Sequence, residues 1–286
     1  MTKLIVGCGY LGRRVAGRWR AAGHEVWGVV RHEAQLRQLA DQRVRGIVAD
    51  VTRPETLRDL PEAETVLFCV GWDPTGGATR RQVYVDGLQA VLDRLAPATG
   101  RVILISSTGV YGAAAGQWVD EASPCRPTRD AGRALLAAEE LLAAHPLGRR
   151  GIVLRLAGLY GPGRLPQTDA IRAGLPIAVA SGRSVNLIHV DDAAAVVLAA
   201  ESLARPPRTY VVADGRPVDR RTYLARLADV LKFPPPTFSD EDGATASQRR
   251  DSGDKRLCNA RMLGELGVRL AYPSFWEGLA QAADGS

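Results

Sequence analysis

The sequence predicts an α/β fold, a doubly wound parallel sheet with a small second lobe. Two observations lead to this prediction. Over the first two-thirds of the 286-residue chain, short apolar runs alternate with segments of helical periodicity, an alternation typical of parallel sheets with right-handed crossovers. A glycine-rich turn also joins the first apolar run directly to the first helical segment, which allows a helix to pack closely on a strand.

The expected strands are short and rich in Val, Ile and Leu, as strands buried on both faces of a sheet are. They cover residues 4–6, 25–30, 44–49, 65–70, 101–105 and 152–156, and later 185–188 and 210–212. The expected helices cover residues 11–22, 33–42, 80–95, 131–144, 191–204 and 220–231. Thr52 is the expected N-cap of a further short helix that ends at Leu57, with Pro54 in its first turn.

The turn after the first strand has the form G-x-G-x-x-G, with Gly7, Gly9 and Gly12 as its glycines. The first glycine permits a tight turn, the second lets the backbone approach a pyrophosphate, and the third lets the helix pack against the strand. The amides at the start of the following helix would point at that phosphate. Because the turn lies between a strand and a helix, a dinucleotide site is favoured over a merely glycine-rich turn, and Cys8 is expected to be a small filler within it.

After residue 158 the alternation of strands and helices loosens. Residues 160–163 are expected to form a turn, residues 234–254 a loop rich in Pro, Gly, Ser and charge, and residues 274–282 an amphipathic segment. We therefore expect a dinucleotide-binding domain made of residues 1–157 and 184–213. Residues 158–183 and 214–286 would form the small substrate lobe.

The composition, 46% hydrophobic and 24% charged, is that of an ordinary globular protein. No stretch approaches the roughly 20 apolar residues that a membrane span needs, and no signal peptide precedes the first strand, so a cytoplasmic location is expected. The net charge of +6 comes almost wholly from arginines scattered along the chain. Such scattered charges are typical of solvated helix faces or of sites for a phosphorylated small molecule, and they argue against nucleic acid as the partner. The four cysteines form no C-x-x-C pair, so neither a disulfide framework nor a metal site is expected.

Five motifs follow one another as they do in the extended short-chain dehydrogenase/reductases, the NAD(P)-dependent epimerase/dehydratase family. They are the glycine turn, Asp50-Val51, Ser106-Ser107-Thr108-Gly109-Val110-Tyr111-Gly112, the run LRLAGLYGPG at 154–163, and Ile188-His189-Val190-Asp191-Asp192. The closing segment at 272–279 is also similar to that of the family. The chain thus resembles this family over nearly its whole length. The resemblance implies a Rossmann domain with a small substrate lobe, in agreement with the pattern of strands and helices.

The resemblance and the glycine turn together imply a cofactor site along the carboxyl ends of the strands. Its expected residues are Gly7, Cys8, Gly9, Tyr10, Leu11, Gly12, Arg31, Asp50, Val51, Val70, Gly71 and Ser106. Ser107 occupies the family's catalytic Ser/Thr position, where its hydroxyl would hydrogen-bond a substrate oxygen. The family commonly dimerises through the helices after the fourth and fifth strands, and apolar residues on both helices here make a homodimer the expected assembly.

Two departures from the family pattern bear on chemistry. The glycine turn is one residue tighter than the usual G-x-x-G-x-x-G. Aligned on Glu139, the family's catalytic Tyr-x-x-x-Lys pair falls on Ala131 and Leu135, and residues 112–159 contain neither tyrosine nor lysine. This loss resembles the atypical, YeeZ-like subgroup of the family, in which the active-site residues are poorly kept.

In the family, the tyrosine exchanges a proton with the substrate while the lysine lowers the pKa of that tyrosine. Such a general acid/base contributes about 10² to 10⁴ in rate, and neither Ala131 nor Leu135 can ionise. Possible substitutes are Tyr84, Asp86, Asp130 and Arg133, each of which is more often a packing or surface residue. His189 is expected to be a satisfied core imidazole at a strand-to-helix junction rather than a catalyst.

The expected cofactor is NADP in preference to NAD. An NAD site places a carboxylate at the end of the second strand, to accept from the ribose 2′-hydroxyl. This chain has Val30-Arg31-His32 there, and Arg31 offers a forked donor to a 2′-phosphate. Two functions remain open. One is an oxidoreductase or epimerase that acts on a nucleotide-sugar-like or other phosphorylated, hence anionic, substrate with non-standard acid/base residues. The other is a non-catalytic NADP(H)-binding sensor or regulator.

Overall fold

The computed structural model describes residues 1–286 except 113, 167, 175, 180–182, 240–253 and 285–286. At its centre lies a seven-stranded sheet in the order β12-β7-β5-β4-β1-β2-β3, and every neighbouring pair is parallel. The strands are β1 (Thr2–Val6), β2 (Glu25–Val30), β3 (Arg45–Val48), β4 (Thr65–Phe68), β5 (Arg101–Ser107), β7 (Gly151–Leu156) and β12 (Arg208–Val212). The predicted doubly wound α/β fold is confirmed.

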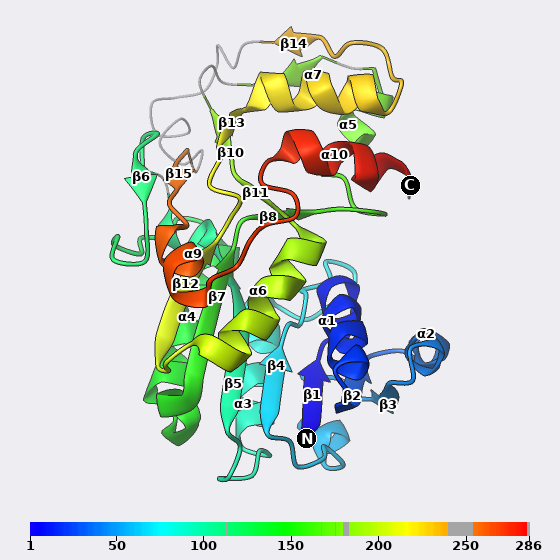
Figure 1. Cartoon of the computed structure of the whole chain (residues 1–286), viewed down its shortest axis with the longest axis vertical. Coiled ribbons are helices and arrows are strands. Elements are labelled where there is room, and N and C mark those ends of the chain that lie inside the picture. The colour runs from blue at the N-terminus through cyan, green and yellow to red at the C-terminus, as the bar shows by residue number, and fades with distance from the viewer. Residues whose placement is uncertain (113, 167, 175, 180–182, 240–253, 285–286) are drawn as a thin grey trace.

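Helices cover both faces of this sheet (Figure 1). On one face, α1 (Tyr10–Ala21) and α6 (Val190–Leu203) bury side chains such as Trp19 and Val196 against the strands. On the other face, α3 (Gly87–Leu92) and α4 (Asp130–Ala144) do so through Leu88 and Leu142. A short 3₁₀ turn, η1 (Glu33–Gln35), and α2 (Leu36–Asp41) join β2 to β3. No helix within the described residues is long and apolar enough to span a membrane.

Two local expectations need correction. Thr52 is not a helix N-cap, because the 3₁₀ turn η2 (Pro54–Leu57) begins after Arg53. The Thr52 hydroxyl instead donates to the Asp50 carboxylate at 2.7 Å, a local side-chain bond of the kind that competes with capping. The helix expected over residues 80–95 is interrupted by a π-helical turn, η3 (Gln82–Asp86), and α3 ends at Leu92. Such π turns are rare and occur frequently at functional sites.

The lobe above the sheet has an apolar cluster of its own, which includes Tyr160, Tyr223 and Phe275. Its helices are α5 (Thr168–Arg172), α7 (Arg220–Val230) and α10 (Phe275–Asp284) (Figure 1). Its short strand pairs are β8 (Gly158–Tyr160) with β11 (Leu187–His189), β10 (Ser184–Val185) with β13 (Val218–Asp219), and β9 (Ile177–Ala178) with β14 (Phe238–Ser239). The loop expected at 234–254 contains β14, and its residues 240–253 lie outside the described part.

Two further elements of the C-terminal chain return to the large domain. Helix α9 (Ala260–Leu266) packs on α6 and β12, and β15 (Arg256–Leu257) pairs with β6 (Trp118–Val119), which follows η4 (Thr108–Tyr111). The turn η5 (Pro146–Arg150) links α4 to β7. The division at residues 157/158, 183/184 and 213/214 remains our prediction. The chain therefore crosses between the sheet and the lobe several times, and residues from both parts meet above the carboxyl ends of the strands.

Candidate cofactor-binding site

A cavity of about 330 Å³ lies at the carboxyl ends of β1, β2 and β4. The strand order reverses there, since β2 and β3 follow β1 on one side and β4, β5 and β7 lie on the other. Open α/β sheets bind their ligands at such a switch point. The lining residues are Val6, Gly7, Cys8, Gly9, Tyr10, Leu11, Val29, Val30, Arg31, Gln35, Ala49, Val51, Cys69, Val70, Gly71, Ile105, Leu156, Leu159 and Arg164.

The glycine turn has the backbone geometry that close approach requires. Gly7 has a φ of +88°, and a Cβ there would lie 2.7 Å from Cα of Val70, so a side chain is excluded. A Cβ on Gly12 would lie 2.9 Å from the carbonyl oxygen of Gly7, which explains the tight contact of α1 with β1. A Cβ on Gly9, in contrast, would meet nothing within 4 Å. Gly9 therefore leaves open space where the first turn of α1, which has no side-chain cap, presents its amides.

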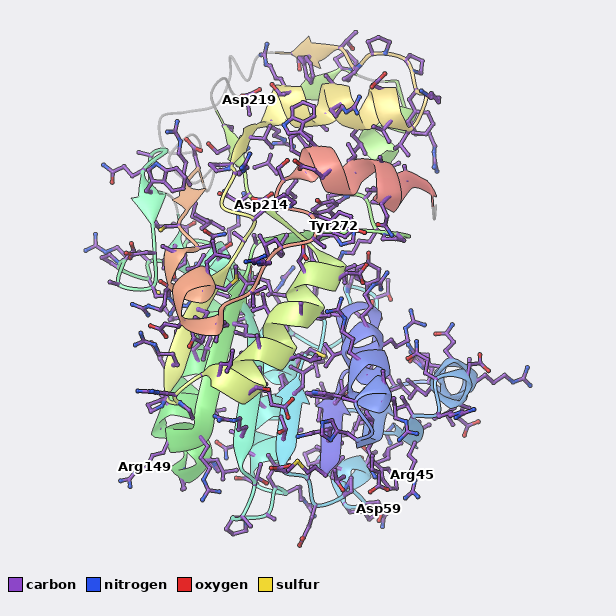
Figure 2. The ribbon with its side chains drawn as sticks, in the orientation of Figure 1. Arg45, Asp59, Arg149, Asp214, Asp219 and Tyr272 are labelled. Carbon is purple, nitrogen blue, oxygen red and sulfur yellow. The ribbon has the colours of Figure 1, made fainter. Side chains whose placement is uncertain are left out.

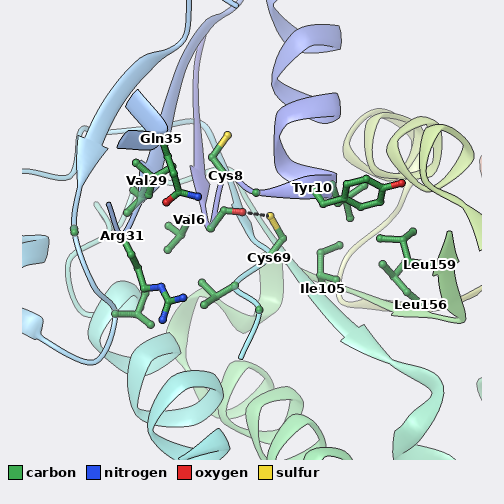
Figure 3. Close-up of a pocket in the computed structure, with 18 of the residues that line it drawn as sticks. Val6, Cys8, Tyr10, Val29, Arg31, Gln35, Cys69, Ile105, Leu156 and Leu159 are labelled. Carbon is green, nitrogen blue, oxygen red and sulfur yellow. Dashed lines mark hydrogen bonds between the residues drawn. The ribbon is translucent and has the colours of Figure 1, made fainter. Parts of the chain in front are cut away.

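Nine of the predicted cofactor residues come together in this lining. Figure 3 shows Arg31, Gln35 and Val29 at one end of the cavity and Tyr10, Leu156 and Leu159 at the other. Gly12, Asp50 and Ser106 lie outside it, as does Ser107. The Asp50 carboxylate accepts from the backbone amide and hydroxyl of Thr52, so it holds the turn of the loop after β3.

The two cysteines of the cavity have thiols that resist ionisation. Burial raises the pKa of Cys8 to about 12, and it also raises the pKa of Cys69. The Cys69 thiol donates to the Gly7 carbonyl at 3.1 Å (Figure 3). A Cβ on Gly28 would lie 3.0 Å from the sulfur of Cys8. Both cysteines therefore act as small packing groups around the turn, as expected for Cys8.

The Ser106 hydroxyl points into a buried network rather than into the cavity. It donates to the Glu139 carboxylate at 2.6 Å. The guanidinium of Arg155 donates to both oxygens of Glu139, at 3.1 and 2.6 Å, and to the Tyr111 hydroxyl at 2.9 Å. Because these side chains come from β5, η4, α4 and β7, the network ties the carboxyl ends of β5 and β7 to α4. Sequence reasoning missed it, although Arg155 lies in the motif at 154–163 and Glu139 is the residue on which the Tyr-x-x-x-Lys pair is aligned.

The helix that carries the positions of the missing catalytic pair, α4, packs on the 3₁₀ turn that follows Ser107. Ser107 caps η4 by accepting from the Gly109 amide at 3.1 Å. A Cβ on Gly132 would lie 2.6 Å from the Gly109 carbonyl oxygen, so the first turn of α4 packs directly on η4. On that helix, Leu135 is only 9% exposed and belongs to the apolar cluster that contains Tyr111. Neither it nor Ala131 offers a proton.

The possible substitutes are mostly engaged elsewhere. Tyr84 accepts through its hydroxyl from the Trp72 amide at 3.2 Å. Asp130 lies 3.4 Å from a guanidinium nitrogen of Arg80, and Arg133 donates to the carbonyl of Thr128. The side chain of Asp86 is exposed. These contacts are those of packing and surface residues, as the sequence predicted.

Arg164 is the charged lining residue that sequence reasoning missed. It follows the Gly-Pro-Gly turn at 161–163 and reaches the cavity from the lobe side. The Tyr10 ring has the guanidinium of Arg14 at 4.3 Å from its centroid and that of Arg164 at 5.7 Å. Arg14 is paired with Asp191 at 3.1 Å, whereas Arg164 has no carboxylate partner among the described residues. The Tyr10 hydroxyl is buried and has no hydrogen-bond partner among the residues that the structure describes.

Polar contacts between α6 and the C-terminal segment close the junction of sheet and lobe. His189 is fully buried, accepts from the Asp191 amide through Nδ1 at 3.2 Å, and contacts the Gln281 side chain through Nε2 at 3.0 Å. Burial lowers the pKa of His189, and the expectation of a satisfied core imidazole is confirmed. Asp192 accepts from the amide of Tyr272 at 2.9 Å. Figure 2 shows Tyr272 and Asp214 at this junction.

A parallel sheet with a glycine turn and an uncapped helix N-terminus at its switch point defines a dinucleotide-binding protein of the Rossmann class. The model of the NAD dependent epimerase/dehydratase family matches residues 4–213, and the chain belongs to that family. Protein YeeZ of Escherichia coli (strain K12) is 30% identical over 277 residues, which cover 94% of this chain and 95% of YeeZ. The predicted likeness to the YeeZ-like subgroup is thereby confirmed.

Solved structures show the same fold along the whole chain. A putative NAD-dependent epimerase/dehydratase from Methylobacillus flagellatus is 34% identical, with a TM-score of 0.78 over 99% of this chain and 97% of that one. A double mutant of DesIV, the dTDP-glucose 4,6-dehydratase of Streptomyces venezuelae, contains bound NAD. It is 21% identical, with a TM-score of 0.83 over 100% of this chain and 96% of that one, a likeness that concerns the fold alone.

Proposed function

We propose that this protein binds NADP(H) in the cavity at the glycine turn. The observation that carries the proposal is the open cradle at Gly9, which a Cβ would fill, beside the uncapped amides of α1. These groups suit a diphosphate. Arg31 at the end of β2 lines the same cavity, in the place where an NAD site would present a carboxylate. We therefore assign Arg31 to the 2′-phosphate of NADP.

We further propose hydride exchange with a nucleotide-sugar-like or other anionic substrate. The nicotinamide would supply hydride transfer when bound. Arg164 supports an anionic substrate, since it brings a guanidinium to the cavity without a carboxylate partner in the described chain. Ser107 would hold a substrate oxygen by a hydrogen bond but is a weak acid and base alone. With Ala131 and Leu135 at the aligned positions of the tyrosine and lysine, proton transfer would rely on other groups.

A second function, a non-catalytic NADP(H) sensor or regulator, is favoured by the apolar surroundings of Leu135, which aligns with the family's lysine. Leu135 is buried among apolar side chains, and no ionisable residue replaces the Tyr-x-x-x-Lys pair on α4. A cofactor would bind and change occupancy with the cellular NADPH level without being turned over. In either function we place the protein in the cytosol as a homodimer.

Two measurements test the proposal. Titration with NADPH and NADH, followed by cofactor fluorescence, should show tighter binding of NADPH. Oxidation of NADPH with a panel of nucleotide sugars and small carbonyl compounds then separates the two functions, with Ser107→Ala as the matched variant. Turnover that Ser107→Ala reduces supports the enzyme, and binding without turnover supports the sensor. Tighter binding of NADH than of NADPH would contradict the cofactor assignment.

A further inference from the structure

The loop that follows β4 delivers a carboxylate to the residue assigned to the 2′-phosphate. Asp73 Oδ2 lies 2.8 Å from Nη2 of Arg31. The other oxygen of Asp73 accepts from the Thr75 amide at 2.9 Å and from the Thr75 hydroxyl at 2.7 Å. Both oxygens of the carboxylate are therefore held, one by the loop and one by Arg31.

The loop itself is firmly built, so the position of Asp73 is defined. The Trp72 indole donates to the Ala78 carbonyl at 2.7 Å, and the guanidinium of Arg80 stacks 3.7 Å from the Trp72 ring. A Cβ on Gly76 would lie 3.2 Å from Nη1 of Arg31, so the arginine rests against the loop backbone. The Arg31–Asp73 pair thus joins the segment after β2 to the loop after β4. Both segments contribute to the cavity lining, through Arg31 and Gly71.

We propose that Asp73 is a cofactor-specificity residue, a counter-ion that the 2′-phosphate of NADP must displace from Arg31. This inference rests on the proposed function. A dianionic 2′-phosphate and the Asp73 carboxylate would compete for the same forked donor and would repel each other. NAD has a neutral hydroxyl at that position and can leave the ion pair intact. Asp73 therefore lowers the ratio of NADP affinity to NAD affinity below the ratio that Arg31 alone would produce.

The exposure and charge of the pair suit such an exchange. The side chains of Arg31 and Asp73 are 37% and 33% exposed, so solvent screens their attraction and a stronger anion can replace the carboxylate. Hydrogen bonds from Thr75 and then from Arg31 lower the pKa of Asp73 to about 2. The carboxylate is therefore charged throughout the neutral range, and the competition does not depend on pH there.

Asp73→Asn is the decisive variant, because an asparagine oxygen can still accept from Thr75 and keep the loop. We expect NADP to bind the variant about threefold to tenfold more tightly, since an exposed ion pair corresponds to about a fivefold effect at most and loss of repulsion adds to it. The Kd of NAD should change less than about twofold, well inside the range of an exposed pair, because its neutral 2′-hydroxyl neither displaces the Asp73 carboxylate nor is repelled by it. Asp59→Asn, at the opposite end of the molecule from the lobe (Figure 2), removes the same charge and should change neither constant.

Two further measurements locate the effect. The gain of Asp73→Asn should appear with 2′,5′-ADP but not with 5′-AMP, since the two probes differ only in the 2′-phosphate. It should shrink in an Arg31→Gln background, which lacks the guanidinium to release, and at high salt, which screens exposed charges.

Three outcomes would overturn the inference. Unchanged NADP binding by Asp73→Asn would show that the carboxylate does not compete. Weaker NADP binding would show that Asp73 positions Arg31 instead. Selectively weaker NAD binding would show that Asp73 accepts from the ribose hydroxyl. Wild-type protein that binds neither NADP nor NAD would instead refute the proposed function itself, so the two failures are distinguishable.

Discussion

The vacant acid/base positions can be refilled, and we expect the double change Ala131→Tyr with Leu135→Lys to raise hydride transfer from NADPH. If both residues occupy the family positions beside Ser107, the new phenol can exchange a proton with the substrate and the new ammonium lowers the pKa of that phenol. A well-placed general acid/base contributes about 10² to 10⁴ in rate. If the wild type turns these substrates over negligibly, as the sensor function requires, the lower end of that range is measurable.

The cost in stability follows from the burial of Leu135, which is 9% exposed. A buried leucine contributes about 1.5 to 3 kcal/mol, and a lysine keeps only part of that through its aliphatic stem. A loss of about 2 kcal/mol corresponds to a fall in Tm of about 4 to 8 °C for a domain of this size. The variant should therefore stay folded at room temperature, which circular dichroism during heating would verify.

The assay is NADPH oxidation with nucleotide sugars and small carbonyl compounds, run beside Ala131→Tyr with Leu135→Met as the matched control. The control keeps the phenol and the apolar volume but lacks the ammonium, so it should gain less. A folded double variant that binds NADPH like the wild type and yet turns over no faster than this control would refute the alignment. Robust wild-type turnover that survives Ser107→Ala would refute it as well.

Four other predictions follow from particular contacts. Gly9→Ala should weaken NADPH binding at least tenfold with little change in Tm. The control Gly17→Ala, also in open space, should leave NADPH binding intact. An equal loss of binding in both variants would contradict the assignment of the open space at Gly9 to the cofactor. Arg155→Met leaves a buried carboxylate unpaired and should destabilise by about 3 to 5 kcal/mol in urea unfolding; a loss below about 1 kcal/mol, typical of a surface pair, would show that the network contributes little. Burial raises the pKa of Asp214 to about 7 from an ordinary value of 3.8. Between these two pH values the folded state binds a proton at Asp214 that the unfolded state has lost. The contribution of Asp214 to the free energy of unfolding therefore falls as pH rises through that range. Accordingly, Asp214→Asn should gain stability over the wild type as pH rises from 5 to 8, and a pH-independent difference would count against this. Light scattering at micromolar concentration should show a dimer, and a monomer would contradict the expected association through α3 and α4.

The sequence predicted the sheet well because the signals it used are local. A run such as Val102 to Ile105 is apolar at every position, and a strand buried on both faces needs nothing more. The glycine turn was equally readable, since a φ of +88° at Gly7 is a property of single residues and their immediate neighbours. The same local reasoning failed at Thr52, where the nearby Asp50 carboxylate offered its hydroxyl a better partner than the helix did.

By itself, the sequence thus determined the class of fold, the place of the dinucleotide cradle and the loss of the Tyr-x-x-x-Lys pair. Only the tertiary structure decided which side chains meet there. It turned Ser106 away towards Glu139, brought Arg164 across from the lobe, and set Asp73 against Arg31, which lies 42 positions earlier in the chain. Backbone periodicity is written in neighbouring residues, whereas the partner of a charged side chain depends on which distant segments the packed sheet brings within hydrogen-bond reach.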